Sequence, residues 1–252
     1  MKLIKKGLLD TWQGLPIYGL QHEGIPPGGA MDTFSLQIAN ALVGNDVYDK
    51  ALEMHFPAGV YQFETSTLIA ICGANFTACV DNVEVPMNQP IKVPPGAILS
   101  CKKPVSGQRV YVAARALQDE QVSRVKVLPW SMNPENVFTD EPIRILCGRE
   151  WEQIKSCSQQ LVLSKSFAIS ATSNRMGYQL IQEPLKTLAK ENLLSSAVTA
   201  GTIQLLPSGQ LVVLMAGHQT TGGYPRIAHV ISADLPRLAQ KGAGDSLRFT
   251  LT

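Results

Sequence analysis

The sequence predicts a mainly β protein built of tandem β-barrels with a few short helices. Short apolar runs, punctuated by Gly and Pro, recur along the whole 252-residue chain. The runs form two series, separated by a polar stretch that contains prolines. The length suits two domains of modest size, each able to bury its own core.

The first series of expected elements covers the N-terminal half of the chain. A helix over Phe34–Leu42 is expected because Asp32 is a good N-cap, apolar residues share one face, and Gly44-Asn45 can end a helix. The expected strands are Ile17–Leu20, Tyr61–Phe63, Leu68–Cys72, Phe76–Val80, Ala97–Cys101 and Arg109–Ala113.

The second series follows the polar stretch Gln118–Pro142, which we take as the domain junction. The expected domains are residues 1–120 and 121–252. A short helix begins near Ser232 or Asp234 and ends before Gly242. The expected strands are Ile143–Cys147, Phe167–Ser170, Thr202–Leu206, Leu211–Met215 and Ser246–Leu251.

Charge and hydropathy argue against several classes of partner. The 22 Lys and Arg nearly balance the 20 Asp and Glu, and no block of like charge occurs, so neither nucleic acid nor a membrane is an expected partner. Apolar runs such as Leu211–Ala216 are far shorter than the roughly 20 residues that cross a bilayer. No signal-peptide pattern is present, and we expect a cytoplasmic protein.

The common cofactor motifs are missing from the sequence. The five cysteines are dispersed without a C-x-x-C pair, so we expect buried reduced thiols and no metal site. No phosphate-binding glycine loop, G-x-S-x-G or H-E-x-x-H motif occurs, and we expect this chain to bind no cofactor. His218, set among glycines and hydroxyls, fits a structural role better than a catalytic one.

The polar loop Ala216–Pro225, directly after an expected strand, is the first candidate site. Gly222 and Gly223 let a ligand approach the backbone, Thr220 and Thr221 add hydroxyls, and Tyr224 offers a face for stacking. Together they could hold a carboxylate, an amide or an oxyanion. A tight hairpin, whose glycines only supply positive φ, explains the loop equally well.

Two further loops carry candidate groups. Arg175, within Ser170–Tyr178, could clamp a carboxylate, although binding of loop carbonyls is favoured on residue type alone. The loop Gly24–Asp32 could bind an anion at a helix N-terminus, but Asp32 is negative and fits a capping role better.

Two polar residues near the first helix remain open. Asn40 either faces solvent or has a specific role, while Asn45 resembles a C-cap. Glu53, between apolar neighbours, could be a general base, but an outward-facing strand residue is the commoner explanation.

Several segments together resemble one protein family over nearly the whole chain. They are Gly24–Asp32, Ala39–Asn45, Leu52-Glu53, Ser173–Tyr178, Gly201–Gln204, Gln219–Pro225 and Ser232–Leu235. The family is the biotin-dependent carboxyltransferase-like family, which includes the C subunit of 5-oxoprolinase (the Kip-antagonist protein) and allophanate hydrolase subunit 2.

The resemblance implies a cyclophilin-like C-terminal barrel and a hydrolase that works only as part of a hetero-oligomer. With two companions, the Kip-inhibitor-like B subunit and the A subunit of 5-oxoprolinase, it would cleave 5-oxo-L-proline to L-glutamate while the complex hydrolyses ATP. The implied catalytic residues are Arg175, Thr220, Thr221 and Tyr224. The implied substrate-binding residues are Asn174, Gln204, Gln219, Gly222, Gly223, Asn40 and Glu53.

The chain departs from the family pattern at Trp12-Gln13, Gly28, Ala114–Ala116 and Gly217-His218. Two alternatives therefore stay open. The first is the carboxyltransferase half of a urea carboxylase or allophanate hydrolase system, which needs biotin on another chain because no Ala-Met-Lys-Met site occurs here. The second is a non-catalytic antagonist that binds a Kip-inhibitor-like partner.

Overall fold

The computed structural model describes residues 1–118, 131, 140–186 and 193–252. Two compact units make up the chain, one formed by Met1–Leu15 with Asp32–Phe138 and the other by Pro16–Met31 with Thr139–Thr252. Pro16–Met31 thus packs with the second unit although it precedes most of the first. The expected boundary at residue 120 lies outside the described residues and stays a prediction.

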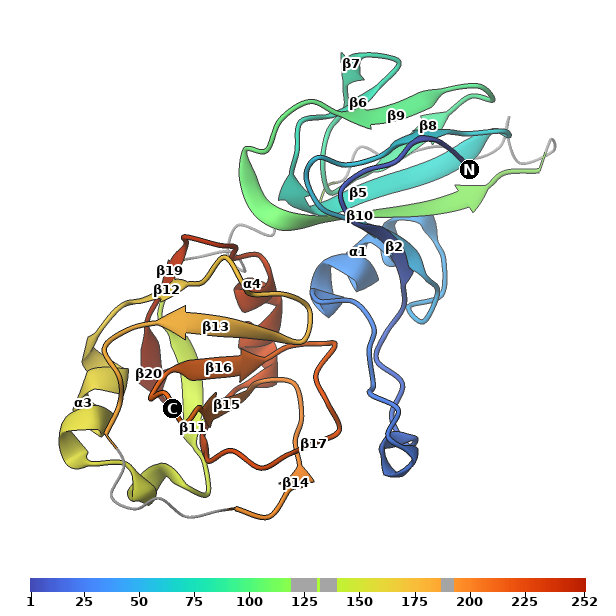
Figure 1. Ribbon diagram of the computed structural model, residues 1–252. Coiled ribbons are helices and arrows are strands. Elements are labelled where there is room, and N and C mark those ends of the chain that lie inside the picture. Colours follow the sequence, from blue (N-terminus) through green and yellow to red (C-terminus); the bar gives the residue numbers. More distant parts are fainter. Residues whose placement is uncertain (119–130, 132–139, 187–192) are drawn as a thin grey trace. The chain divides into compact units, whose positions relative to one another are not determined.

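The first unit is built from two five-stranded antiparallel sheets (Figure 1). Side chains from both sheets, including Leu52, Tyr61, Ile71, Leu99 and Val112, form one buried core. In spatial order, the strands of one sheet are β1 (Lys2–Lys5), β4 (Val60–Gln62), β9 (Ile98–Cys101), β6 (Ala78–Val80) and β7 (Val83–Glu84). The strands of the other sheet are β2 (Asp10–Gln13), β3 (Ala51–Met54), β10 (Ser106–Ala116), β5 (Thr67–Asn75) and β8 (Pro90–Val93).

The expected first helix is confirmed as α1 (Thr33–Val43), which lies against β5 and β10 (Figure 1). The Asp32 side chain accepts a hydrogen bond from the Ser35 backbone N–H at 2.9 Å, so its capping role is confirmed. The helix ends at Gly44, whose φ of 74° is left-handed. The C-cap is Gly44 and not Asn45, which follows it: the Asn45 backbone N–H donates to the Asn40 carbonyl at 3.0 Å, and its side chain donates to Asn40 Oδ1 and to the Ala114 carbonyl.

The expected strand Ile17–Leu20 is wrong. A 3-10 turn, η1 (Gln21–Glu23), follows it, and local hydrogen bonds replace a strand ladder. The Gly19 N–H donates to the Gln21 side chain at 2.7 Å, and the Leu20 carbonyl accepts from Glu23 at 3.0 Å. The left-handed φ of 107° at Gly19 is incompatible with a regular strand.

The second unit is a barrel-like eight-stranded sheet, so the predicted mainly β, barrel-type fold is confirmed. Its order begins with β19 and ends with β20, and only Arg248 separates these strands in sequence, so the sheet curls back on itself (Figure 1). In order, the strands are β19 (Ser246–Leu247), β12 (Phe167–Ile169), β13 (Gly177–Ile181), β16 (Leu211–Leu214), β15 (Thr202–Leu205), β18 (Arg226–Val230), β11 (Ile143–Cys147) and β20 (Phe249–Leu251).

The second core fills this barrel. The rings of Phe167 and Phe249 pack with centroids 5.4 Å apart, and Ile203, Val213 and Met31 join them in the same cluster. Met31 anchors the segment Pro16–Met31 to this unit. A separate short ladder pairs β14 (Ser196–Ala197) with β17 (Thr221–Gly222).

Short helices complete the second unit. The expected helix after Ser232 is confirmed as η3 (Ser232–Asp234) continuing into α4 (Leu235–Ala239), with Pro236 in its first turn. The turn η2 (Trp151–Gln153) and α3 (Ser156–Ser164) were not expected, because the α3 sequence is polar and buries only Ser158 and Val162. Among the described residues, no helix is long and apolar enough to cross a membrane.

The expectation of buried thiols holds for only part of the set. All five cysteines are free; Cys72 and Cys79 are buried, but Cys147 and Cys157 are exposed. Cys147 ends the strand β11, and Cys157 lies in the first turn of the polar helix α3, so neither side chain reaches a core.

Candidate functional site

The loop Ala216–Pro225 carries most of the predicted site residues. It follows β16, forms β17 at its centre and leads into β18. Thr221 and Tyr224 are exposed, and Gln219, Thr220, Gly222 and Gly223 are half-buried. The Thr220 carbonyl accepts from the Val198 N–H at 3.1 Å, which holds the loop beside the β14 segment.

The glycines of this loop serve close approach and not positive φ. Neither Gly222 nor Gly223 is among the left-handed residues of the chain, so the hairpin explanation of these glycines is wrong. A Cβ added at Gly222 would lie 2.5 Å from Nε2 of Gln204, and one at Gly223 would lie 3.3 Å from the Leu193 carbonyl oxygen. These glycines therefore let other groups pack directly against the backbone.

Gln204 and Gln219 form a pair of carboxamides at the base of the loop. Gln204 points from β15 and is 2% exposed. Its Oε1 accepts from Nε2 of Gln219 at 3.4 Å, while its buried Nε2 has no hydrogen-bond partner in the part of the chain that the structure describes. The structure thus brings Gln204, Gln219 and Gly222 together.

Arg175 lies on the loop between β12 and β13, next to the start of the Ala216–Pro225 loop. Its carbonyl accepts from the Gly217 N–H at 2.7 Å, and its Nη2 donates to the Gly29 carbonyl. Binding of a loop carbonyl, one of the two expected roles of Arg175, is therefore confirmed. Asn174 is exposed, and its Oδ1 accepts from the Met176 N–H at 2.8 Å to close the turn.

His218 has a structural role, as expected. It is buried, and its Nδ1 is hydrogen-bonded to the Gln219 carbonyl, so the imidazole holds the backbone at the start of the loop.

Asn40 and Glu53 belong to the first unit. Asn40 is buried and donates from Nδ2 to the Asp49 carbonyl at 2.7 Å. Glu53 is 1% exposed, so the expectation of an outward-facing residue is wrong. Its Oε2 accepts from the Tyr111 hydroxyl at 2.6 Å because Tyr111 lies directly opposite Glu53 on the neighbouring strand β10.

The Tyr111 hydroxyl joins both acidic residues of this first-unit network. It accepts from the Asp32 backbone N–H at 2.9 Å while it donates to Glu53. Ser35 Oγ donates to Asp32 at 2.6 Å. Burial raises the pKa of Tyr111 well above its usual value, and the nearby charges of Glu53 and Asp32 raise it further, so the phenol stays protonated.

An ion pair that sequence reasoning missed holds the far end of the loop. Arg226 directly follows Pro225, and its guanidinium donates to both oxygens of Glu150, at 2.8 and 3.1 Å. The Arg226 backbone N–H adds a third bond at 2.9 Å. Burial alone would raise the pKa of Glu150, but the bonds from Arg226 outweigh it and lower that pKa.

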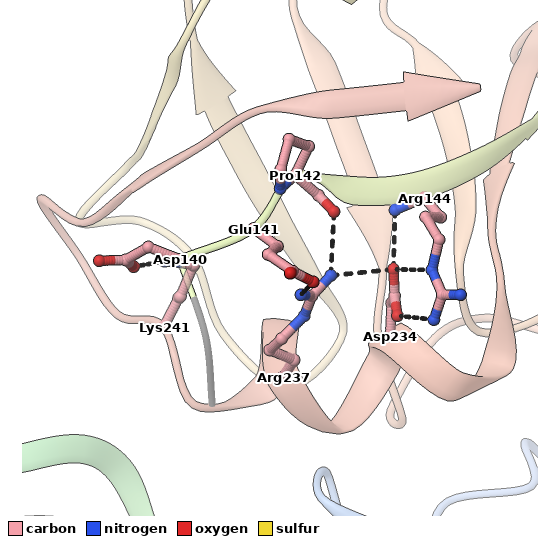
Figure 2. Close-up of polar contacts among 7 residues, drawn as sticks. All are labelled: Asp140, Glu141, Pro142, Arg144, Asp234, Arg237 and Lys241. Atoms are coloured by element: carbon pink, nitrogen blue, oxygen red, sulfur yellow. Dashed lines mark hydrogen bonds and ion pairs between the residues drawn. The ribbon is translucent and has the colours of Figure 1, made fainter. Parts of the chain in front are cut away.

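A second charged cluster anchors α4 to β11 (Figure 2). Asp234 accepts from the backbone N–H and the guanidinium of Arg144, both at 2.7 Å, and from Arg237 at 3.0 Å. Burial opposes ionisation of Asp234, but the bonds from Arg144 and the charge of Arg237 lower its pKa. The partners are 90 residues apart in sequence, so no local signal could have revealed them.

A surface pocket of about 350 Å³ lies beside this cluster. Side chains of both charges line it, including Asp140, Lys241, Asp245 and Arg248, and none of the predicted site residues does. Lys241 pairs with Asp140 at 3.4 Å (Figure 2). Within the described ranges, no group of His, Cys, Asp and Glu is arranged to hold a metal ion.

Solved structures first define the class of this fold. The crystal structure of the K. lactis urea amidolyase matches with a TM-score of 0.85 over 98% of this chain and 18% of that chain, at 22% identity. At this level of identity the match establishes the fold alone, that of a domain within a larger enzyme.

The sequence then places the chain in a family. The model of the carboxyltransferase domain, subdomain A and B, matches residues 23–119 and 116–251, and the chain belongs to this family. It is 33% identical over 279 residues to the C subunit of 5-oxoprolinase from Escherichia coli, covering 99% of this chain and 90% of that protein. The protein of the same name from Haemophilus influenzae is 31% identical and covers 95% and 87%, respectively.

Proposed function

We propose that this chain belongs to an ATP-dependent 5-oxoprolinase complex that opens 5-oxo-L-proline to L-glutamate. The observation that carries the proposal is the 33% identity to the C subunit of a 5-oxoprolinase over nearly the full length of both proteins. Because that relative is named as one of several subunits, companions are part of the proposal, here the A and B subunits.

The proposed reaction breaks the lactam C–N bond. One water adds its oxygen to the carbonyl carbon, and the ring nitrogen leaves as the amine after taking a proton. Hydrolysis of ATP to ADP and phosphate consumes a second water. We assign ATP binding to one of the companions, since this sequence has no phosphate-binding glycine loop.

The proposed site is the Ala216–Pro225 loop together with the Arg175 loop and Gln204 on β15. Hydroxyls of Thr220 and Thr221 and the N–H groups of Gly222 and Gly223 are suited to an oxyanion that forms on the lactam carbonyl. Tyr224, exposed on the same loop, is suited to cover the ring.

The other predicted residues would bind or orient the substrate. Arg175 is suited to its carboxylate, with Asn174 beside it, and Gln204 and Gln219 offer carboxamides. Asn40 and Glu53 remain proposals only, and the partners that each has within the first unit favour a structural role.

Reconstitution with the companion proteins tests the proposal. We expect ATP-dependent glutamate release to require this chain. It should fall at least tenfold with Thr221→Val, because removing one oxyanion donor costs about a hundredfold or more in known cases. It should also fall at least tenfold with Arg175→Ala, because the substrate carboxylate then loses its charged partner. Thr250→Val and Arg248→Ala are matched controls, since both residues are exposed on or beside the terminal strand β20. Full activity without this chain would contradict the proposal.

The carboxyltransferase alternative rests on the likeness to urea amidolyase. Biotin would then arrive on another chain and supply the carboxyl group. Nε2 of Gln204, which has no acceptor among the described residues, would fit the ureido carbonyl oxygen of biotin as well as a lactam carbonyl. Tight binding of a companion protein without any effect on turnover would favour the antagonist alternative.

A further inference from the structure

The side-chain N–H group of Gln204 is a buried donor that has no acceptor among the described residues. Its side chain is 2% exposed, and its Oε1 is engaged by Gln219. Within the described ranges, its Nε2 is buried and has no partner. Buried polar groups in native proteins are nearly always satisfied, so this N–H group requires an acceptor that the described residues do not supply.

The position of this amide is specific. A Cβ on Gly222 would lie 2.5 Å from Gln204 Nε2 and 3.5 Å from Gln219 Nε2, so both carboxamides face the backbone of β17. The φ of Gly222 is not left-handed, and the glycine is needed only for this approach. The amide of Gln204 therefore lies against the same loop that carries Thr220 and Thr221.

The loop can part from this amide at small cost. Among the described residues, two paired positions, Ser196 with Gly222 and Ala197 with Thr221, join β17 to β14, and the bond from the Val198 N–H to the Thr220 carbonyl adjoins them. A two-stranded ladder of this length has little stability of its own. A ligand can thus reach Gln204 by displacing β17, without opening the main barrel sheet.

The surroundings of Gln204 favour a neutral acceptor. Its charged cross-strand neighbour is Arg226, whose guanidinium is held by Glu150 in a two-bond ion pair. The side-chain donors that face β17 are then the neutral carboxamide N–H groups of Gln204 and Gln219. Burial of a carboxylate among neutral dipoles is much less favourable than burial of a carbonyl, because the charge loses its hydration.

We propose that Gln204 determines specificity by donating from Nε2 to an amide-type carbonyl oxygen of the ligand, with Gln219 beside it. The identity of that ligand as the lactam 5-oxo-L-proline rests on the proposed function above. A ureido carbonyl, as in biotin, has the same chemistry, and the experiment separates the two.

Side-chain amide resonances of Gln204 test the contact directly. The full chain, labelled at the glutamine side-chain nitrogen, is titrated with 2-pyrrolidinone, 5-oxo-L-proline, L-proline and biotin, and Gln204→Met assigns the signal. We expect 2-pyrrolidinone and 5-oxo-L-proline to shift the Gln204 signal and L-proline, which lacks the lactam carbonyl, to leave it unchanged. A shift with biotin alone would identify the ureido ligand. No shift with any carbonyl probe would overturn the proposal and leave Gln204 as the site of an internal water.

Kinetics of the reconstituted complex separate binding from folding. Gln204→Met should raise KM for 5-oxo-L-proline about tenfold, the worth of one buried hydrogen bond, without lowering the thermal midpoint of the chain. The matched control Gln210→Met should lower the thermal midpoint and leave KM unchanged, because Gln210 Nε2 donates to the Gln182 carbonyl at 3.0 Å in a turn. An unchanged KM with Gln204→Met would overturn the inference even if the complex is active.

The experiments distinguish failure of the proposed 5-oxoprolinase function from failure of the proposed carbonyl site at Gln204. A complex without 5-oxoprolinase activity, together with a Gln204 signal that still moves with 2-pyrrolidinone, would refute the proposed function and retain the carbonyl site. An active complex whose Gln204 signal ignores every carbonyl probe would retain the function and refute the site.

Discussion

The two units each bury a polar group of residues, and the two groups differ in how they are satisfied. In the first unit, Tyr111 connects Glu53 to Asp32 through bonds of 2.6 and 2.9 Å. In the second, Gln204 presents a buried N–H group with no acceptor among the described residues. A closed network stabilises a fold, whereas an unfilled donor next to a glycine loop is a feature of a binding site. Burial of a polar residue alone does not distinguish the two.

The largest effect on stability is expected in the closed network. Tyr111→Phe removes the hydroxyl that donates to Glu53 and leaves that buried carboxylate without one of its donors. We expect the free energy of unfolding to fall by about 2–3 kcal/mol. Chemical denaturation measures it, with Tyr224→Phe, a change at an exposed hydroxyl, as the control.

Cys72 provides a second readout of the same network. It is buried, and both burial and the charge of Asp32 raise the pKa of its thiol, so it should resist alkylation in the native protein. Tyr111→Phe should speed that labelling, while the exposed Cys147 and Cys157 react at unchanged rates. Equal labelling of Cys72 in both proteins would mean that Tyr111 does not hold the network closed.

A smaller, pH-dependent effect on stability is expected at the ion pair between Arg226 and Glu150, at the end of the Ala216–Pro225 loop. Bonds from Arg226 hold the pKa of Glu150 in the folded protein below its value in the unfolded chain. At a pH between these two pKa values, the unfolded chain therefore binds more protons than the folded protein. The stabilisation is present above the unfolded pKa of about 4 and is lost as pH falls through the lower folded pKa. Glu150→Gln should lower stability at pH 7 by about 1–2 kcal/mol and flatten its decline below about pH 5.

Thermal unfolding of both proteins over a pH series checks this expectation. Glu152→Gln is the control, because Glu152 is an exposed neighbour on the same turn. A decline with acid that is equally steep in Glu150→Gln and in the unaltered chain would show that other carboxylates cause it.

Local sequence signals predicted the parts of the fold that depend on near neighbours. Asp32 caps α1 through Ser35, three residues away, and Gly44 ends the helix, so both ends of α1 could be predicted from the sequence. Apolar runs such as Leu211–Met215 predicted β11, β12, β15 and β16 to within a residue, but β13 and β18 were not predicted and the expected strand Ser246–Leu251 is divided into β19 and β20. Strand Ile17–Leu20 failed because the turn at Gly19 and Gln21 satisfies its backbone locally.

The chemistry of the sites depends on residues far apart in sequence, and it was less readable. Glu53 is buried opposite Tyr111, 58 residues later on the neighbouring strand, and Tyr111 supplies its donor. Gly222 and Gly28 look alike in sequence, but Gly28 has a φ of 61° and Gly222 is needed only to make room for Gln204. Only the packed structure tells a glycine that turns the chain from one that admits a neighbour.

The smallest stability effect is expected where the functional effect is large. Gly222→Ala places a Cβ 2.5 Å from Nε2 of Gln204, the far end of a flexible side chain that can move aside. We expect stability to change by less than about 1 kcal/mol, because the barrel core is untouched. Turnover in the reconstituted complex should fall at least tenfold, since the carboxamide then leaves the position in which it meets the ligand.

Gly14→Ala is the matched control, because its Cβ would meet only ordinary contacts at 3.5 and 3.6 Å. If Gly222→Ala lowers stability by as much as Tyr111→Phe, the Gln204 cluster is a structural network like that of the first unit. If it lowers turnover alone, the difference between a closed and an open polar cluster separates the structural from the functional residues of this chain.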